Sequence, residues 1–188
     1  MNSSPSSQWF GERFAKIHPL LQAIHINSGL LSGPVDITLG SGLAGIVGRR
    51  LAGKLGIPVD TGDHTLQVAI SHQSDGLHWD RCFDGDQWVR SLFQPVGQWP
   101  DGHWVEHTGP IKLFLSVDIH DGGWHWRVLK GRLAGITLPR WLLPQTTAYK
   151  LIEDGRYRFY VGISVPLLGT VLSYSGLLDA TPSAPTQL

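Results

Sequence analysis

Hydrophobic and polar residues alternate along most of the chain after residue 60. The alternation is clearest in residues 66–70, 111–119 and 157–165. Because successive side chains of a strand point to opposite faces, a period of two predicts half-buried β-strands. The turns between these segments, such as residues 74–76 and 154–155, are Asp-Gly sequences too short for crossover helices. The strands are therefore expected to be antiparallel.

The number of alternating segments indicates a mainly β fold of the α+β kind. We expect about eight to nine strands in a curved antiparallel sheet, or in a lipocalin-like barrel or half-barrel. Before residue 60 the spacing is helical, because apolar residues recur three or four positions apart in residues 9–24 and 42–55. Gly56 and Pro58 end the second of these segments as helices commonly end. These N-terminal helices are expected to cover the sheet.

A single β-rich domain is expected over residues 8–179. Residues 1–7 and 180–188 contain Ser and Pro but no aromatic residue, and are expected to be flexible termini. The apolar segment 136–144 breaks the alternation, because prolines at both sides of its centre exclude a regular central strand. It is either a lid that closes one end of the sheet or an exposed surface around Trp141 that docks on a membrane or partner protein.

The composition of the chain limits which partners and which cellular compartment are expected. Lys and Arg number 15, as do Asp and Glu, so the chain lacks the basic excess that non-specific nucleic-acid binding requires. The lone Cys82 excludes an internal disulfide framework and fits a reducing compartment. We find no secretory signal at the N-terminus and no apolar run long enough for a membrane span. A cytoplasmic location is therefore expected.

Several motifs are spread over most of the chain. They are His25, Gly56-Ile57-Pro58, Trp79-Asp80-Arg81-Cys82-Phe83, Glu106 with Gly109-Pro110, residues 135–144, and Pro166-Leu167-Leu168-Gly169 followed by Tyr174 and Gly176. Together they resemble the bacterial family known as domain of unknown function 4166, and we expect a stand-alone member. In that family the domain is often attached to a nucleotide-dependent oxidoreductase or epimerase-like domain, which implies an oxidoreductase as a partner. The resemblance implies no established activity.

Two patterns in the sequence bear on cofactor and metal binding. Residues 40–45 spell G-x-G-x-x-G before a predicted helix, the spacing of dinucleotide-binding loops. Such a loop needs a βαβ unit, and although Asp60 lies at a suitable distance, the strands that follow form hairpins. The nine histidines show neither a His-Glu-x-x-His pattern nor a clear third ligand for a metal. We therefore expect no cofactor and no metal.

The predicted strand at residues 77–83 carries the main candidate for chemistry. Arg81 shares one face of this strand with apolar side chains that include Trp79. An inward guanidinium needs an acceptor, because burying an unpaired charge is costly. Glu106, which precedes His107 on another predicted strand, is the expected partner. The pair is either structural or acts on a ligand or substrate.

Three further residues are candidates for ligand binding. His25 closes the helical cover, where it either faces the sheet or satisfies helix-terminal carbonyls. Tyr149 and Tyr174 offer hydroxyls and flat surfaces, although aromatic residues are more often part of the core. The candidate ligand-binding set is His25, Trp79, Arg81, Glu106, Tyr149 and Tyr174.

The function favoured by these patterns is binding of a hydrophobic small molecule in an apolar cavity. A lipid, an isoprenoid or a polyketide-like compound fits such a cavity. The first alternative is an enzyme for a hydrophobic substrate, with Arg81, Glu106 and His107 as its catalytic groups. The second is an accessory interaction domain for an oxidoreductase. The chain has no G-x-S-x-G elbow, P-loop or Cys-His signature, so the sequence does not decide whether it is an enzyme.

Overall fold

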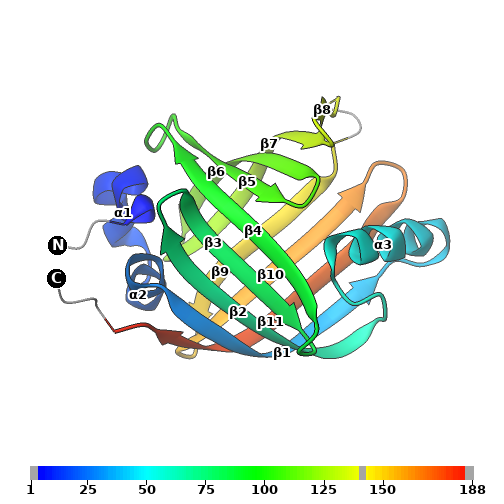
Figure 1. The fold of residues 1–188 in the computed structure, drawn as a ribbon, viewed down its shortest axis with the longest axis horizontal. Coiled ribbons are helices and arrows are strands. Elements are labelled where there is room, and N and C mark those ends of the chain that lie inside the picture. Colours follow the sequence, from blue (N-terminus) through cyan, green and yellow to red (C-terminus); the bar gives the residue numbers. More distant parts are fainter. Residues whose placement is uncertain (1–3, 140–142, 185–188) are drawn as a thin grey trace.

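The computed structural model describes residues 4–139 and 143–184, and Figure 1 shows antiparallel strands wrapped around one another with short helices beside them. The long strands are β1 (Gly29–Leu39), β2 (Gly62–Gln73), β3 (Gly76–Phe83), β4 (Gln87–Val96), β5 (His103–Thr108), β6 (Ile111–His120), β7 (Gly123–Leu133), β9 (Gln145–Glu153), β10 (Arg156–Val165) and β11 (Gly169–Pro182). A two-residue strand, β8 (Ile136–Thr137), pairs with the end of β7.

The ten long strands of the described residues close into a barrel. Their order around it is β6, β5, β4, β3, β2, β1, β11, β10, β9 and β7, and pairing between β6 and β7 completes the ring. The prediction of a mainly β, antiparallel fold is therefore confirmed. Of the expected forms the structure has the closed barrel, and it has ten long strands where about eight to nine were expected.

The periodicity of the sequence did not predict β1. Leu31, Val35 and Ile37 of this strand are buried. The inward position between Leu31 and Val35 is occupied by Gly33, and Pro34 follows it. Because Gly33 has no side chain to mark the inward face, the apolar alternation is interrupted at the middle of the strand.

The helices lie at different places around the barrel (Figure 1). At one end are α1 (Pro5–Phe10), the 3₁₀-helix η1 (Gly11–Lys16) and α2 (Pro19–Asn27). Away from them, α3 (Gly42–Leu55) packs on β11 and β1. The expected N-terminal helical cover is present, but it is divided between two parts of the barrel. No helix in the described residues is both long enough and apolar enough to cross a membrane.

Regular elements extend past both of the expected domain limits. The helix α1 begins at Pro5, where the hydroxyl of Ser4 accepts from the Ser7 amide and the Ser7 hydroxyl accepts from the Ser4 amide. This reciprocal capping satisfies amides that would otherwise lack partners at the helix start. At the other terminus β11 continues to Pro182. Residues 5–7 thus belong to α1 and residues 180–182 to β11.

Residues 40–45, which spell G-x-G-x-x-G, follow β1 and continue into the first turn of α3, which begins at Gly42. The next strand, β2, is antiparallel to β1, so no βαβ crossover exists. The glycines instead permit close backbone approach, because a Cβ on Gly45 would collide with the carbonyl oxygen of Gly40. A Cβ on Gly48 would likewise collide with the carbonyl oxygen of Val171.

Tryptophan side chains fill the barrel end beneath α1 and α2. The Trp104 ring lies 5.7 Å from Trp9 and 5.9 Å from Trp124, and Phe10 packs edge-on against Trp124 at 4.8 Å, measured between ring centroids. Both Trp104 and Trp124 are almost fully buried. We call this pair the tryptophan plug, because it closes that end of the barrel interior.

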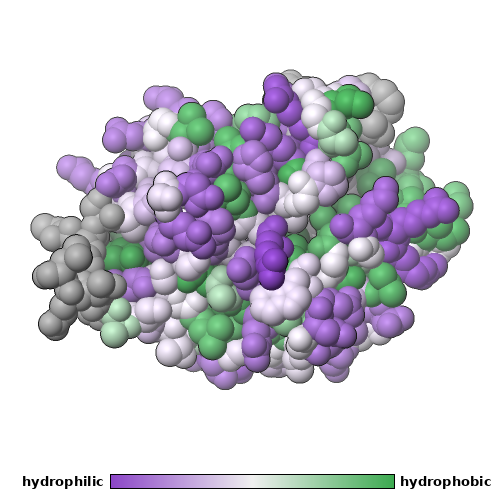
Figure 2. All heavy atoms as spheres, viewed as in Figure 1, coloured by the Kyte–Doolittle hydropathy of each residue, from purple (hydrophilic) through white to green (hydrophobic). Residues whose placement is uncertain are grey.

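The segment predicted as a lid or a docking surface, residues 136–144, lies only partly within the described residues. Residues 140–142, including Trp141, lie outside the described residues. Beside them, Ile136 of β8 is exposed. Hydrophobic side chains are also exposed on α3, among them Leu43 and Ile46, and in the turn between β10 and β11, at Leu167. Figure 2 shows green residues gathered at the end of the molecule where α3 lies.

Candidate functional site

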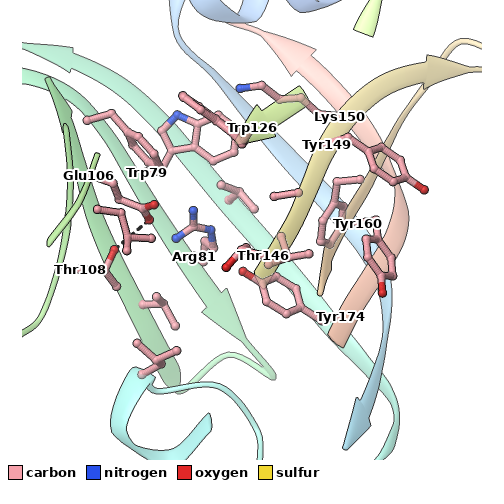
Figure 3. Close-up of a pocket in the computed structure, with 18 of the residues that line it drawn as sticks. Trp79, Arg81, Glu106, Thr108, Trp126, Thr146, Tyr149, Lys150, Tyr160 and Tyr174 are labelled. Carbon is pink, nitrogen blue, oxygen red and sulfur yellow. Dashed lines mark hydrogen bonds between the residues drawn. The ribbon is translucent and has the colours of Figure 1, made fainter. Parts of the chain in front are cut away.

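A cavity of about 180 Å³ lies inside the barrel. Its wall is mainly apolar, with Leu31, Leu66, Val68, Leu115 and Phe159 among the contributing residues. Polar side chains also line it, and Figure 3 shows several of them in the cavity region. These polar lining residues include Arg81, Glu106, Thr108, Thr146, Lys150 and Tyr174.

Arg81 lies on the inward face of β3, two residues after Trp79, and its guanidinium carbon is 5.6 Å from the centre of the Trp79 ring. Its Nη1 donates a hydrogen bond of 2.9 Å to the hydroxyl of Ser91 on β4. Within the described residues, no carboxylate forms an ion pair with Arg81 and no second acceptor binds its guanidinium.

Arg81 and Glu106 do not meet directly, contrary to the predicted contact. Ser91 and Thr108 stand opposite each other on β4 and β5, with their hydroxyl oxygens 2.5 Å apart. Thr108 donates to Oε1 of Glu106 at 2.9 Å, so its single proton is used there and Ser91 must donate to Thr108. Hydrogen bonds therefore run from Arg81 through Ser91 and Thr108 to Glu106. We call the two intervening hydroxyls the hydroxyl relay.

His107 does not join this cavity. Glu106 lines the cavity, and the neighbouring His107 points to the other face of β5 because side chains alternate along a strand. There it lies beside Lys112 of β6. Partial burial lowers the pKa of His107, and the charge of Lys112 lowers it further. The structure thus separates His107 from the catalytic group in which it was predicted.

Tyr174 lines the cavity, as does the unpredicted Tyr157, and both side chains are buried. Burial raises the pKa of each phenol, while the positive charge of Arg81 opposes part of that rise. Both hydroxyls therefore remain protonated at neutral pH and can donate a hydrogen bond. The apolar edge of Tyr174 packs against Phe83 and Phe159, with ring centroids 6.0 and 5.9 Å away.

Lys150 on β9 is the main polar lining residue that the sequence analysis missed. Its side chain is only 3% exposed. Its Nζ lies 2.7 Å from Nε2 of His25, and 4.0 and 4.4 Å from the ring centres of Trp124 and Trp79. No carboxylate within the described residues forms an ion pair with it.

Two opposing effects act on the charge of Lys150. Burial disfavours the ammonium, and the positive charge of Arg81 adds to that effect, so the pKa of Lys150 is lowered well below its usual value. The faces of Trp124 and Trp79 attract the ammonium and act against this shift, while burial remains its largest cause.

His25, predicted to bind ligand, does not line the cavity but forms a hydrogen bond with Lys150, which does. Its Nδ1 lies 2.8 Å from the carbonyl oxygen of Leu21. Because a carbonyl only accepts, Nδ1 carries the proton and Nε2 is left to accept from Lys150. The His25 ring also stacks on Trp124 at 4.8 Å, and its complete burial lowers the pKa of the imidazole well below the usual value. His25 is therefore a neutral acceptor.

Tyr149, another predicted ligand contact, borders the cavity, but its ring belongs to a stack on the outer face of the barrel. The ring is 5.5 Å from His125 and 5.7 Å from Tyr160, and nearly parallel to both. Figure 3 shows the rings of Tyr149 and Tyr160 turned away from Arg81. Its hydroxyl is thus not among the groups that converge with Arg81 on the cavity.

The site therefore combines apolar walls with hydrogen-bond donors and amines that have few protein partners. In the part of the chain that the structure describes, no three His, Cys, Asp or Glu residues gather to hold a metal ion. Residues 17–178, from just before α2 through most of β11, match the model of a family described as Domain of unknown function (DUF4166). No curated protein matches the chain.

Proposed function

Because the chain belongs to the DUF4166 family, whose description assigns no activity, its function has to come from the site, and we propose that the barrel binds an apolar small molecule with an anionic or carbonyl end. The observation that carries this proposal is a guanidinium, Arg81, in an apolar cavity with a neutral hydroxyl as its described partner. Lipids, isoprenoids and polyketide-like compounds with a polar end are the classes of ligand that fit.

Arg81 has donors left for such a ligand. A guanidinium carries five N–H groups, and Ser91 occupies one of them. A carboxylate or carbonyl that accepts from the others would form charge-assisted hydrogen bonds, which are roughly twice as strong as neutral ones. The phenol of Tyr174 supports the same preference, because burial keeps it protonated beside Arg81.

The size of the cavity limits the ligand. An engineered protein cavity of about 150 Å³ holds one benzene molecule, and this one is of similar size at about 180 Å³. Leu55 and Ile57, at the end of α3, line the cavity as well. We propose that a compact molecule, or the end of a longer chain that leaves beside α3, occupies the space.

An enzyme acting on such a molecule is the second candidate function. It is favoured by the presence of Glu106 and Lys150 in the same cavity as Arg81, although His107 cannot contribute from the outer face. A cytoplasmic location fits the single buried Cys82 and is part of the proposal. The proposal of an oxidoreductase partner rests only on the resemblance of the sequence to the family, in which the domain is often attached to such an enzyme.

Binding of decanoate, a ten-carbon carboxylate, tests the proposal by titration calorimetry with decan-1-ol as the uncharged analogue. We expect saturable binding of decanoate, weakened by about 10–100-fold in Arg81→Met, because a hydrogen bond to a charged group is worth about 1.5–3 kcal/mol. Met retains the packing of the arginine stem. Binding of decan-1-ol should change much less.

Arg90→Met is the matched control, because Arg90 lies over Trp88 on the outer face of the same sheet. That variant should bind decanoate as the parent protein does. The proposal fails if the folded protein binds neither compound, or if Arg81→Met and Arg90→Met have equal affinity for decanoate.

A further inference from the structure

The amine of Lys150 lies in the cavity wall at a cost to the stability of the fold. The side chain is buried against the tryptophan plug without a carboxylate among the described residues, although an apolar side chain would fill the same space at lower cost. Lys150 also lines the cavity, so it borders the space where the ligand is proposed to lie.

The hydrogen bond to His25 orients this amine. Nε2 of His25 can only accept, because Nδ1 uses the ring proton on the Leu21 carbonyl. One N–H of Lys150 therefore points at His25 over the 2.7 Å separation. A neutral amine held in this way has its lone pair directed elsewhere, and the indole faces beside it offer no proton to occupy that lone pair.

Burial and a second cation favour the neutral form of the amine. Lysine becomes a nucleophile when it is desolvated in a hydrophobic site or placed next to another positive group. Both conditions hold for Lys150, because it is buried among tryptophans and the positive charge of Arg81 acts on it. Arg81 cannot give up its own proton in a protein, so the lysine is the member of the pair that becomes neutral.

We propose that Lys150 forms an imine with an aldehyde or ketone group of the apolar ligand, an inference that rests on the proposed function and deepens it. The Nζ lone pair attacks the carbonyl carbon, and a proton passes from nitrogen to the carbonyl oxygen to give a carbinolamine. The hydroxyl then leaves with a second proton from nitrogen as water, and the C=N bond forms. The step consumes no oxidant or reductant, and hydrolysis reverses it.

Reductive trapping with decanal, the aldehyde of the same chain length as decanoate, tests the imine. The protein is incubated at pH 7.5 with decanal and sodium cyanoborohydride, and the modified lysines are located by peptide mass spectrometry. We expect one decyl group, on Lys150, added at least ten times faster than on any surface lysine. A lysine with an ordinary pKa of about 10.4 is roughly one part in a thousand neutral at that pH.

Lys150→Met should lose this adduct, and Lys112→Met, which removes an outer-face lysine beside Phe114, should keep it. If Lys150→Met does not fold, the relative labelling of lysines within the unaltered protein decides the question. The pH profile adds an independent readout, because labelling of Lys150 should decline at a lower pH than labelling of the surface lysines.

Propanal separates this inference from the proposed function, since its short chain does not require the apolar cavity to hold a ligand. Selective labelling of Lys150 by propanal, without decanoate binding, would support the reactive amine and overturn the ligand proposal. Decanoate binding together with labelling spread over the surface lysines, or with no labelling, would overturn the imine and leave the ligand proposal standing.

Discussion

The guanidinium of Arg81 and the carboxylate of Glu106 are joined by two hydroxyl groups and not by a direct ion pair. Arg81 donates to Ser91 at 2.9 Å, and Thr108 donates to Glu106 at 2.9 Å. The residues lie on three consecutive strands of the barrel, about 4.8 Å apart from strand to strand. Each hydroxyl has one proton, so removal of either interrupts the chain of hydrogen bonds.

Loss of the relay should destabilise the fold measurably. Ser91→Ala removes the acceptor of Arg81 and the donor to Thr108, and leaving such groups without partners costs about 1–3 kcal/mol. Urea denaturation should show a loss in that range. Ser164→Ala is the control, because Ser164 and Thr170 form a similar hydroxyl pair on exposed strands, where about 0.5 kcal/mol or less is expected. Equal losses in the two variants would contradict a buried, coupled relay.

The buried Lys150 should make stability rise with pH. Above its lowered folded pKa, the folded protein lacks a proton that the unfolded chain holds up to about pH 10.4. The free energy of unfolding therefore increases through that window by about 1.4 kcal/mol per pH unit. Denaturation of Lys150→Met should show greater stability at pH 7 and a smaller slope.

Comparing the parent protein with Lys150→Met separates the effect of Lys150 on stability from that of the other titratable groups. The raised pKa values of Tyr157 and Tyr174 act in the opposite direction, but only above about pH 10 and equally in both proteins. Parallel stability curves between pH 7 and 10 would mean that Lys150 keeps its proton when folded.

Two glycines of α3 should respond oppositely to alanine. A Cβ on Gly48 would collide with the carbonyl oxygen of Val171, so Gly48→Ala must push the helix off β11 and should cost about 1–3 kcal/mol. A Cβ on Gly53 would lie 3.6 Å from Val59, an ordinary contact. Gly53→Ala should therefore stabilise by up to about 1 kcal/mol through helix propensity. Thermal denaturation measures both, and a stable Gly48→Ala would exclude the close packing.

The ion pair of His64 and Asp84 should contribute most to the stability of the fold in mildly acidic solution. Partial burial lowers the pKa of His64, but hydrogen bonds to Asp84 and the Asp60 carbonyl outweigh it and raise the net value. Hydrogen bonds from Thr65 and His64 lower the pKa of Asp84. The contribution of Asp84 is present above about pH 3.9 and lost as pH falls, whereas that of His64 is present below about pH 6.5 and lost as pH rises.

Asp84→Asn is expected to reduce stability most between those two pH values and to lower the pKa of His64. A histidine titration by nuclear magnetic resonance, with His78 as a second reporter paired to Asp75, measures the shift. An unchanged His64 titration in Asp84→Asn would show that the ion pair does not form in solution.

Local patterns in the sequence were enough to predict the antiparallel fold and the face of β3 on which Arg81 lies. Alternation with apolar residues places that side chain inward, and short Asp-Gly turns exclude crossovers, because both signals are local. The position of Lys150 was also within reach. Counting back along both strands from the Asp154-Gly155 turn places Lys150 opposite Phe159, which shares its apolar face with Tyr157.

Which polar groups contact one another depends on the pairing of distant strands in the folded barrel. The pairing of β6 with β7 closes the barrel and fixes the number of strands. Gly33 interrupts the apolar alternation of β1, so the periodicity of the sequence did not reveal this strand. Glu106 was expected as the partner because it is the nearest downstream carboxylate on a predicted strand, but the register of β4 with β5 places Ser91 and Thr108 between it and Arg81. Likewise His25 meets Lys150 across 125 positions. Such contacts depend on long-range pairing and barrel closure, and no local pattern records them.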